Sequence, residues 1–411
     1  MRRVGRALFV AFVCAATAAG SLLVERAPAR AEMWCAYPLW VHEWGVQSFA
    51  ADGSALAPPV ALPSYFHGPR SRPRPGPAAG TVVRDLAPDS GIRALPVLHF
   101  YSAGSMSDPV PVAIEVGFTH GEATRWFPQV DRRTPAAAAR SDAARAARER
   151  LRTARGRQTV MGPRQPLGPD PTSQLEWSRL ELTAEPRHTR ARTDAAWVER
   201  LRAFGARWVN TPDESERFVF YEATTSERVA LSIARGPQHR PGHRHYVLRN
   251  RGQHAVHDVQ LVHRERGATF VFAAPSIPAG ATAGFVLEQH RVAPARIADA
   301  TRGRLRNQLL DDREPAPPRE YRWDRSDCRM QRDPAVPVER AEGHRLYAHE
   351  VDAILDVWGA RFFDRPGTSV VYREDTAYLE AAVPLAVYTD MYNFPLLRRT
   401  GLASWTGVVL P

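Results

Sequence analysis

The sequence contains no lysine, since all 55 basic residues among its 411 are arginine. A formal net charge of +11 would suit a nucleic-acid-binding protein, but the charge is concentrated in two segments. The first 31 residues have a net charge of +4 and residues 131–164 have a net charge of +7, so the remainder is close to neutral. Nucleic-acid-binding proteins gather basic residues on one folded face. We therefore expect no nucleic-acid partner.

Several catalytic motifs are also absent. The sequence has no G-x-S-x-G element, which presents the nucleophile of many serine hydrolases. It has no P-loop, and no G-x-G-x-x-G follows a predicted strand. Its two His-Glu pairs, His42-Glu43 and His349-Glu350, do not extend to the zinc motif H-E-x-x-H. These absences favour a protein that is not an enzyme.

The two His-Glu pairs have different structural interpretations. If residues 39–46 form a strand, His42 and Glu43 point to opposite faces and cannot act as a pair. Trp40, His42 and Trp44 would then share one face, which is more typical of a core than of a catalytic site. His349-Glu350 falls on the polar side of a predicted amphipathic helix, where we expect it to face solvent.

Long hydrophobic runs are absent beyond the N-terminus. Residues 8–24 are apolar, follow three arginines and precede Ala29-Arg30-Ala31. This order is typical of a secretory signal peptide, which we expect to be cleaved after Ala31. A retained membrane anchor is the alternative, but the run is near the lower length limit for a span. The mature protein is therefore predicted to be exported, either periplasmic or secreted, and without a transmembrane segment.

Cysteine is scarce, with three residues in the chain. Signal cleavage would remove Cys14 and leave Cys35 and Cys328. An even pair in an exported protein favours a disulfide, with two free thiols as the alternative. We predict a Cys35–Cys328 bond.

Short strand patterns dominate the chain up to about residue 290. In residues 112–118, for example, Val112, Ile114, Val116 and Phe118 alternate with smaller or polar residues. Short strands separated by Gly- and Pro-containing turns predict a mainly β protein with one or two antiparallel β-sandwich units. Two hairpins are expected, one with a loop at residues 119–122 and one with a turn from Asn250 to His254. The predicted strands are 95–102, 112–118, 123–129, 175–183, 216–223, 228–234, 244–250, 255–263, 268–274 and 283–289.

Composition divides the chain into six segments. After residue 340 the pattern changes to an amphipathic helix with one apolar stripe, followed by closing strands. The stripe consists of Leu346, Val351, Ile354, Leu355, Trp358 and Phe362. The segments are a signal peptide (1–31), an N-terminal β region (32–130), an Arg/Ala/Pro-rich insertion (131–171), a β-sandwich region (172–295), a Pro/Arg-rich linker (296–340) and a C-terminal helix with strands (341–411).

The insertion could bind anions. Residues 136–155 have high helix propensity, and four arginines would form a stripe on one side of that helix. The opposite side offers mainly alanine, so we expect a solvated helix or a disordered insertion. Binding of a polyanionic surface through residues 131–164 is one interpretation, and a tolerated low-complexity insert is the other, which the composition favours. The candidate anion-binding residues are Arg145, Arg148, Arg152 and Arg155.

Residues 239–263 contain six of the 14 histidines. A zinc site needs three or four converging ligands, and His243, His245 and His257 are the candidates in this stretch. His257 and His263 share a strand face with Val259 and Leu261 between them, which favours packing over metal binding. We therefore predict no cofactor and keep zinc as the alternative.

Four stretches together resemble an uncharacterised set of exported bacterial proteins with a HEWG-type opening and a P-V-L-x-F-Y-S strand. That set has no known activity, so the resemblance implies export and no chemistry. The chain departs from the usual opening at Val46-Gln47, where the set has Thr and a second β-hydroxyl residue. The four stretches are "VHEWGVQSF" (41–49), "LPVLHFYS" (95–102), "TRWFPQ" (124–129) and "ERFVFYEA" (216–223).

The sequence as a whole predicts a non-catalytic binding or structural protein of the cell envelope or exterior, whose ligand it does not identify. The alternative is an exported hydrolase, assisted by a metal held in the histidine stretch.

Overall fold

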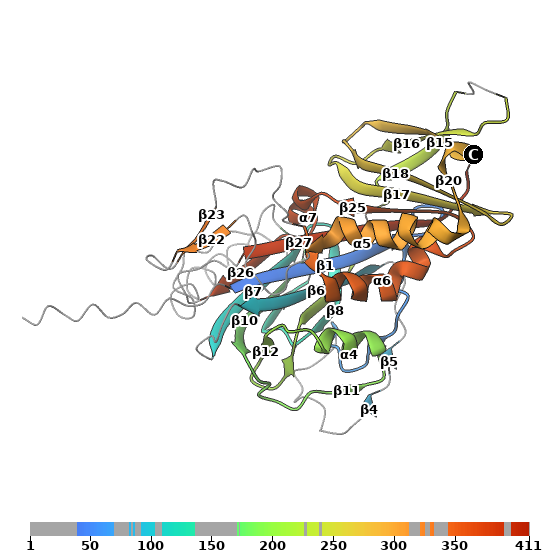
Figure 1. The fold of residues 1–411 in the computed structure, drawn as a ribbon. Helices are drawn as coiled ribbons and strands as arrows, with labels where there is room; N and C mark the ends of the chain where they lie inside the picture. The colour runs from blue at the N-terminus through green and yellow to red at the C-terminus, as the bar shows by residue number, and fades with distance from the viewer. Residues whose placement is uncertain are drawn as a thin grey trace, which may run out of the picture. The chain divides into compact units, whose positions relative to one another are not determined.

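The computed structural model of the protein describes most of the chain that follows the expected signal peptide. The described residues belong to one unit, Tyr37–Pro411, whose fold is drawn in Figure 1. They are 39–69, 82–83, 85–86, 92–102, 109–135, 171, 173–225, 228–237, 241–311, 321–324, 329–332, 344–389 and 396–410. The signal peptide (1–31), both cysteines of the predicted disulfide and all four candidate anion-binding arginines lie outside them.

A ten-stranded sheet, called here the large sheet, runs through this unit. Its two central strands, β1 and β27, pair in parallel over ten residues, from Trp40–Leu396 to Phe49–Trp405. The other pairs in this sheet are antiparallel. In spatial order the strands are β20 (Arg291–Val292), β18 (Ala268–Ile277), β17 (Val256–Glu265), β25 (Gly367–Glu374), β27 (Leu396–Val408), β1 (Leu39–Phe49), β6 (Ile92–Ser102), β14 (Val219–Thr225) and β8 (Gly121–Phe127), with β2 (Ala55–Leu56) paired to β1.

Two smaller sheets cover one face of the large sheet. The six-stranded sheet packs over β1, β6 and β14 through side chains such as Val41, Phe100 and Ile114. The three-stranded sheet packs over β17, β18 and β25 through side chains such as Leu248 and Phe272. The first contains β13 (Ser215–Glu216), β12 (Trp208–Asn210), β10 (Ser173–Thr183), β7 (Val110–Phe118), β26 (Leu385–Thr389) and β9 (Arg132–Thr134); the second contains β15 (Leu231–Arg235), β16 (His245–Asn250) and β19 (Thr282–Val286).

Helices cover the opposite face of the large sheet. The helices α4 (Ala196–Arg202), α5 (Arg304–Leu309) and α6 (Ala348–Phe363) contribute to one apolar core with Trp40, Trp44 and Leu402. The rings of Trp44 and Trp358 meet edge to face, with 6.3 Å between their centroids. Figure 1 shows α5 and α6 along the large sheet. The fourth helix, α7 (Thr376–Ala382), adds Ala382 to the core on the face of the six-stranded sheet.

Short elements complete the described chain. They are β3 (Leu62–Pro63), β4 (Val82–Val83), β5 (Asp85–Leu86), β11 (Arg192–Thr193), η1 (Leu287–His290), η2 (Pro294–Arg296), η3 (Asp299–Gly303), β21 (Leu310–Asp311), β22 (Tyr321–Asp324), β23 (Arg329–Arg332) and β24 (Leu346–Tyr347). Within the described residues, no helix has the length and apolar character needed to cross a membrane.

The mainly β, sandwich-like fold class is confirmed, and so is the C-terminal amphipathic helix. The helix α6 begins after Tyr347 and ends at Phe363, before Pro366. All six residues of the predicted stripe are buried, although Leu346 lies in β24 just before the helix. The stripe is buried because it covers the β1 side chains that point to the helical face of the sheet.

Both predicted hairpins are wrong. The strands β7 and β8 belong to different sheets, and so do β16 and β17. Each loop therefore carries the chain across the core from one sheet to the other, and we call the two loops arches. Alternation shows which residues of a strand face a core, but a short Gly-containing loop suits a hairpin and an arch equally well. The local sequence pattern therefore does not specify which strand pairs with which.

The first part of the expected Pro/Arg-rich linker, 296–340, is folded. The segment from η3 to α5 packs against α6, and Leu305 and Leu309 are fully buried in the helical core. The apolar residues here are few, and the surrounding arginines obscured their spacing in the sequence.

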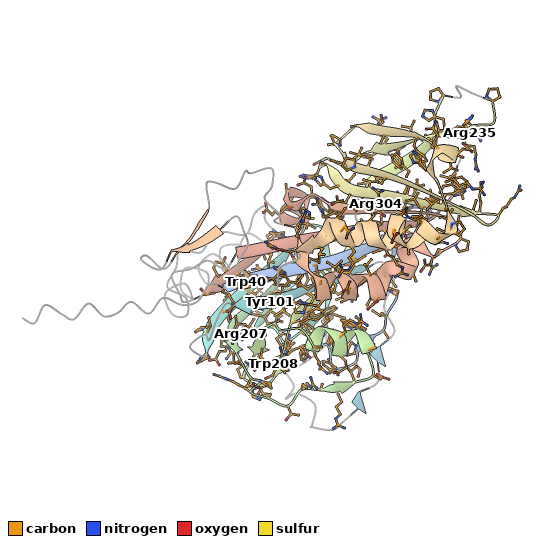
Figure 2. The ribbon with its side chains drawn as sticks, viewed as in Figure 1. Trp40, Tyr101, Arg207, Trp208, Arg235 and Arg304 are labelled. Atoms are coloured by element: carbon orange, nitrogen blue, oxygen red, sulfur yellow. The ribbon has the colours of Figure 1, made fainter. Side chains whose placement is uncertain are left out.

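The substitution Leu305→Ala should therefore lower the free energy of unfolding by about 2–5 kcal/mol, because it removes a fully buried side chain and leaves a cavity. Its neighbour Arg304 is exposed on the same helix (Figure 2), so Arg304→Ala should change stability by less than about 0.5 kcal/mol. Urea denaturation of the two variants measures the difference. Equal stability of both variants would show that α5 does not belong to the core.

Candidate functional site

The two arches line the same pocket, which we call the arch pocket. It has a volume of about 460 Å³. Thr119 and His120 of the β7–β8 arch form one part of its wall, and residues 251–256 of the β16–β17 arch form another. The start of β15 and the segment from the end of β25 through α7 complete the wall. Ligand pockets of proteins commonly have 300–1,000 Å³, so the volume is sufficient for a small organic molecule.

Asn250 holds the second arch in shape. Its side chain is fully buried, and its Nδ2 donates to the carbonyl oxygens of His254 at 2.8 Å and Ile277 at 2.9 Å. Its Oδ1 accepts from the N–H of Gly252 at 2.9 Å. One amide thus satisfies three backbone groups, two in the arch and one at the end of β18, as buried polar groups require. The turn in the histidine stretch is therefore held in a fixed conformation at the rim of the pocket.

The start of α7 forms the part of the wall next to this arch. Asp375 caps this helix by accepting from the N–H of Ala377 at 2.8 Å, and its other oxygen lies 2.9 Å from His257 Nε2. Burial alone would raise the pKa of the Asp375 carboxyl, but the hydrogen bonds from His257 and Ala377 outweigh burial and lower it. The carboxylate is therefore ionised and already occupied by partners of its own. Beside it, the ring of Tyr378 meets His254 edge to face at 5.9 Å.

Two exposed arginines line the pocket. Arg228 lies just before β15, and Arg251 lies in the β16–β17 arch. The loops that carry them are joined by a hydrogen bond of 2.8 Å from the N–H of Arg251 to the carbonyl of Ala230. Within the described part of the chain, neither guanidinium forms a salt bridge, although the charge of Arg228 helps to lower the pKa of the nearby Asp52 carboxyl. The pocket therefore presents two cationic side chains: Arg228, which lies near the Asp52 carboxylate, and Arg251, which forms no salt bridge with a described residue.

The candidate zinc ligands do not converge. His245, at the start of the central strand of the three-stranded sheet, has its Nδ1 3.0 Å from the carbonyl oxygen of Pro237. His257 is bound to Asp375 on the large sheet. His243 is half-buried in the turn before β16. Within the described ranges, no group of three or more His, Cys, Asp or Glu side chains is arranged to hold a metal ion. Of the described histidines in residues 239–263, His254 lines the arch pocket.

The HEWG opening leads to a second cluster, on the helical face of β1. His42 Nδ1 lies 2.7 Å from Glu350 Oε2, and His99 Nδ1 lies 3.6 Å from Glu350 Oε1. All three side chains are fully buried, as is Trp40, which donates to the Tyr347 hydroxyl at 2.7 Å. Trp40 and Tyr101 project from neighbouring strands in this region (Figure 2).

The expectation that His349-Glu350 faces solvent is therefore wrong. Glu350 also accepts from the N–H of Tyr347 at 2.9 Å, so it closes the first turn of α6 from inside the core. His349 is half-buried against Tyr101, whose hydroxyl lies 3.0 Å from His349 Nε2. The helix pattern alone does not predict this burial. A charged residue is buried only when a partner from elsewhere in the chain, here His42, meets it.

The prediction that His42 and Glu43 point to opposite faces is confirmed. Glu43 turns to the other side of the sheet, where it accepts from the Tyr221 hydroxyl and from the Arg399 guanidinium. Arg399 also donates to the carbonyl of Val383 at 2.7 Å. This ion pair links the two central strands on the face that carries α7.

The residues that line the arch pocket were mostly missed by the sequence analysis, which singled out only the histidine stretch. Asp375-Thr376 before "AYLEAA" is a helix N-cap signal that would have located α7. Arg228, Arg251 and Tyr378 carry no comparable signal, because they meet only through the crossing of the arches.

Comparisons with known proteins add little. No protein family model matches the chain, and no curated protein is similar to it in sequence. The solved structures that are similar include two of the yeast delta-COP-I mu-homology domain, one of them complexed with a Dsl1 WxWxV peptide. Each is 8% identical and covers 90% of this chain and 95% of that domain, with TM-scores of 0.25 for the complex and 0.23 for the other. Similarity at this level supports no conclusion about this chain.

The buried cluster makes stability depend on pH. Burial lowers the pKa of His99 to about 3, so the folded protein keeps this ring neutral. Unfolding restores the pKa to about 6.5, and the unfolded chain then binds the proton more tightly. Stability from this residue is therefore complete above about pH 6.5 and falls as the pH drops toward 3, with a slope of up to about 1.4 kcal/mol per pH unit.

We predict that His99→Asn reduces this slope between pH 6.5 and 3, as measured by urea denaturation at a series of pH values. Burial also lowers the pKa of His344 to about 3, so His344→Asn is the matched comparison. Because the two residues should contribute separately, the double variant should lose both contributions. A slope in His99→Asn equal to that of the wild type would contradict the assignment of a neutral buried His99.

Proposed function

We propose that this protein is an exported, non-catalytic binding protein that holds a small organic anion in the arch pocket. One observation carries the proposal: Arg228 and Arg251 both line a pocket of about 460 Å³, and neither forms a salt bridge with a described residue. The planar guanidinium binds carboxylate and phosphate groups through paired hydrogen bonds. An oxyanion is thus the chemical group that these two side chains are suited to bind.

The carboxylates of the pocket already have partners within the protein, which favours an anionic ligand over a cationic one. Asp375 is occupied by His257 and by the N–H of Ala377. Glu374 is about nine-tenths buried and has partners within the protein. The accessible charge at the pocket is therefore mainly that of the two arginines.

The rest of the lining supports an organic ligand with an apolar body. Val229, Ala255, Ala381 and the half-buried Tyr378 all face the pocket. Pockets that combine apolar walls with a few polar groups orient small molecules by those groups and gain affinity from the burial of apolar surface. The described histidines give the metal-assisted hydrolase no comparable support, because His245 and His257 are engaged on different sheets.

The test is equilibrium binding of straight-chain alkanoates and alkyl phosphates of matched length, measured by calorimetry on the full mature chain. The two series distinguish a carboxylate from a phosphate as the preferred anion. Arg228→Gln and Arg251→Gln should each weaken binding at least tenfold, because a hydrogen bond to a charged group contributes about 1.5–3 kcal/mol.

Two matched controls accompany the arginine variants. Arg249 is exposed in β16, two residues before the arch, and lies outside the pocket, so Arg249→Gln should bind as the wild type does. Ala255→Trp should block the pocket, whereas Ala279→Trp, on an exposed turn, should not. Anion binding that survives both Arg228→Gln and Arg251→Gln, or that Ala255→Trp leaves intact, would refute the proposed site.

A further inference from the structure

A second, smaller cavity lies on the other side of α7, and we call it the inner hollow. It has a volume of about 50 Å³. Tyr378 and Ala381 of α7 face the arch pocket, whereas Leu379 of the same helix faces the inner hollow. Glu374, at the end of β25, lines both. The hollow therefore adjoins the arch pocket across a single short helix.

Two glycines line the inner hollow. Gly45, the glycine of the HEWG opening, and Gly401 are register partners in the parallel pair of β1 and β27. A Cβ at position 401 would lie 2.6 Å from Leu379 Cδ2 and 2.8 Å from Glu374 Oε2, and a Cβ at position 45 would lie 3.3 Å from Pro96. The two strands lack side chains here, and Leu379 and Glu374 pack into the resulting recess of the sheet surface. A side chain at position 401 would therefore clash with them.

A buried amide without a partner lines this recess. Gln47 lies two residues after Gly45, so its side chain projects from the same face of β1. It is 3% exposed, and neither Nε2 nor Oε1 has a hydrogen-bond partner among the described residues. Buried polar groups in proteins are nearly always paired, so an unpaired amide that lines a cavity points to a ligand group or to ordered water.

The charges around the hollow favour a neutral group. Glu43 and Arg399 both line it and bind each other, so they largely neutralise one another. A ligand cation would lie near Arg399, and a ligand anion would lie near Glu43 and Glu374. A hydroxyl is neutral and both donates and accepts, which matches the two unpaired atoms of the Gln47 amide. A cavity of about 50 Å³ holds a hydroxymethyl group but not a ring.

We infer that the inner hollow is a subsite for a hydroxyl group of the bound anion, with Gln47 as the residue that recognises it. This inference rests on the proposed function and names the ligand more closely: an organic anion with a hydroxyl at the end remote from its oxyanion. The oxyanion binds Arg228 and Arg251, and the hydroxyl end passes beside Glu374 and α7 to reach Gln47.

The experiment uses a chain-length series of ω-hydroxyalkanoates, HO–(CH₂)ₙ–COO⁻, against alkanoates of equal length, on the full mature chain. At the length that spans both sites, the wild type should bind the hydroxy acid at least tenfold more tightly than the alkanoate. Sites built to bind a hydroxyl discriminate strongly against analogues that lack it. Equal affinities at every length would overturn the inference and leave ordered water as the partner of Gln47.

Two variants test the role of Gln47. Gln47→Met has similar size without the hydrogen-bonding atoms, so it should abolish the preference for the hydroxy acid while alkanoate affinity stays the same. Gly401→Ala, whose Cβ would force Leu379 and Glu374 to move and so reshape the hollow, should have the same effect and serves if Gln47→Met does not fold. The control is Gln260→Met, which replaces another buried glutamine whose Nε2 binds Gln308 outside both cavities. A preference that persists in Gln47→Met would overturn the inference.

Neutral 1-alkanols separate this inference from the proposed function. They carry the hydroxyl without the oxyanion, so their binding should depend on Gln47 and not on Arg251. Alkanol binding lost in Gln47→Met, together with alkanoate binding unaffected by Arg251→Gln, would support the subsite and refute the proposed function. Alkanoate binding that needs Arg251, without any dependence of hydroxyl binding on Gln47, would do the reverse.

Discussion

The structure depends on the parallel pairing of β1 with β27, which joins the first and last described strands at the centre of the large sheet. This pairing places Glu43 beside Arg399, and the resulting buried ion pair satisfies two charges that neither strand could bury alone. It also aligns Gly45 with Gly401. The register of β1 with β27 thus determines both the Glu43–Arg399 ion pair and the recess next to it. A shift of one residue would turn every side chain of β1 to the other face and remove both.

The same strand separates two kinds of polar chemistry. On the helical face, His42 and Glu350 form a pair that is fully buried under α6, so it stabilises the core and is not accessible to a ligand. On the opposite face, the polar residues lie beside cavities, because the arches and α7 leave space between the sheets. The candidate site is therefore found beside these cavities, and the His42–Glu350 pair belongs to the core.

Local patterns were sufficient to predict most strands, the sandwich-like class and α6, because alternation and the 3.6-residue stripe report directly which residues are buried. They were insufficient for connectivity. The loops after Phe118 and Asn250 were predicted as hairpin turns and are arches, since loop composition does not specify the partner strand. Leu305 was assigned to a linker because isolated apolar residues among arginines form no recognisable period. Arg228, Arg251 and Tyr378 come from three separate segments, and only the arches bring them to one pocket, so no motif could have marked them.

Anion binding where the arches and α7 meet can be measured by hydrogen–deuterium exchange of the full mature chain with and without a saturating alkanoate. Bound ligand slows exchange where it suppresses local opening. With ligand bound, exchange of backbone amides should be slower in residues 228–230, 251–256 and 374–382. It should not change at the start of α6, where His42 and Glu350 are already buried. Slower exchange around His42 and α6, without any change in residues 251–256, would rule out anion binding in the arch pocket.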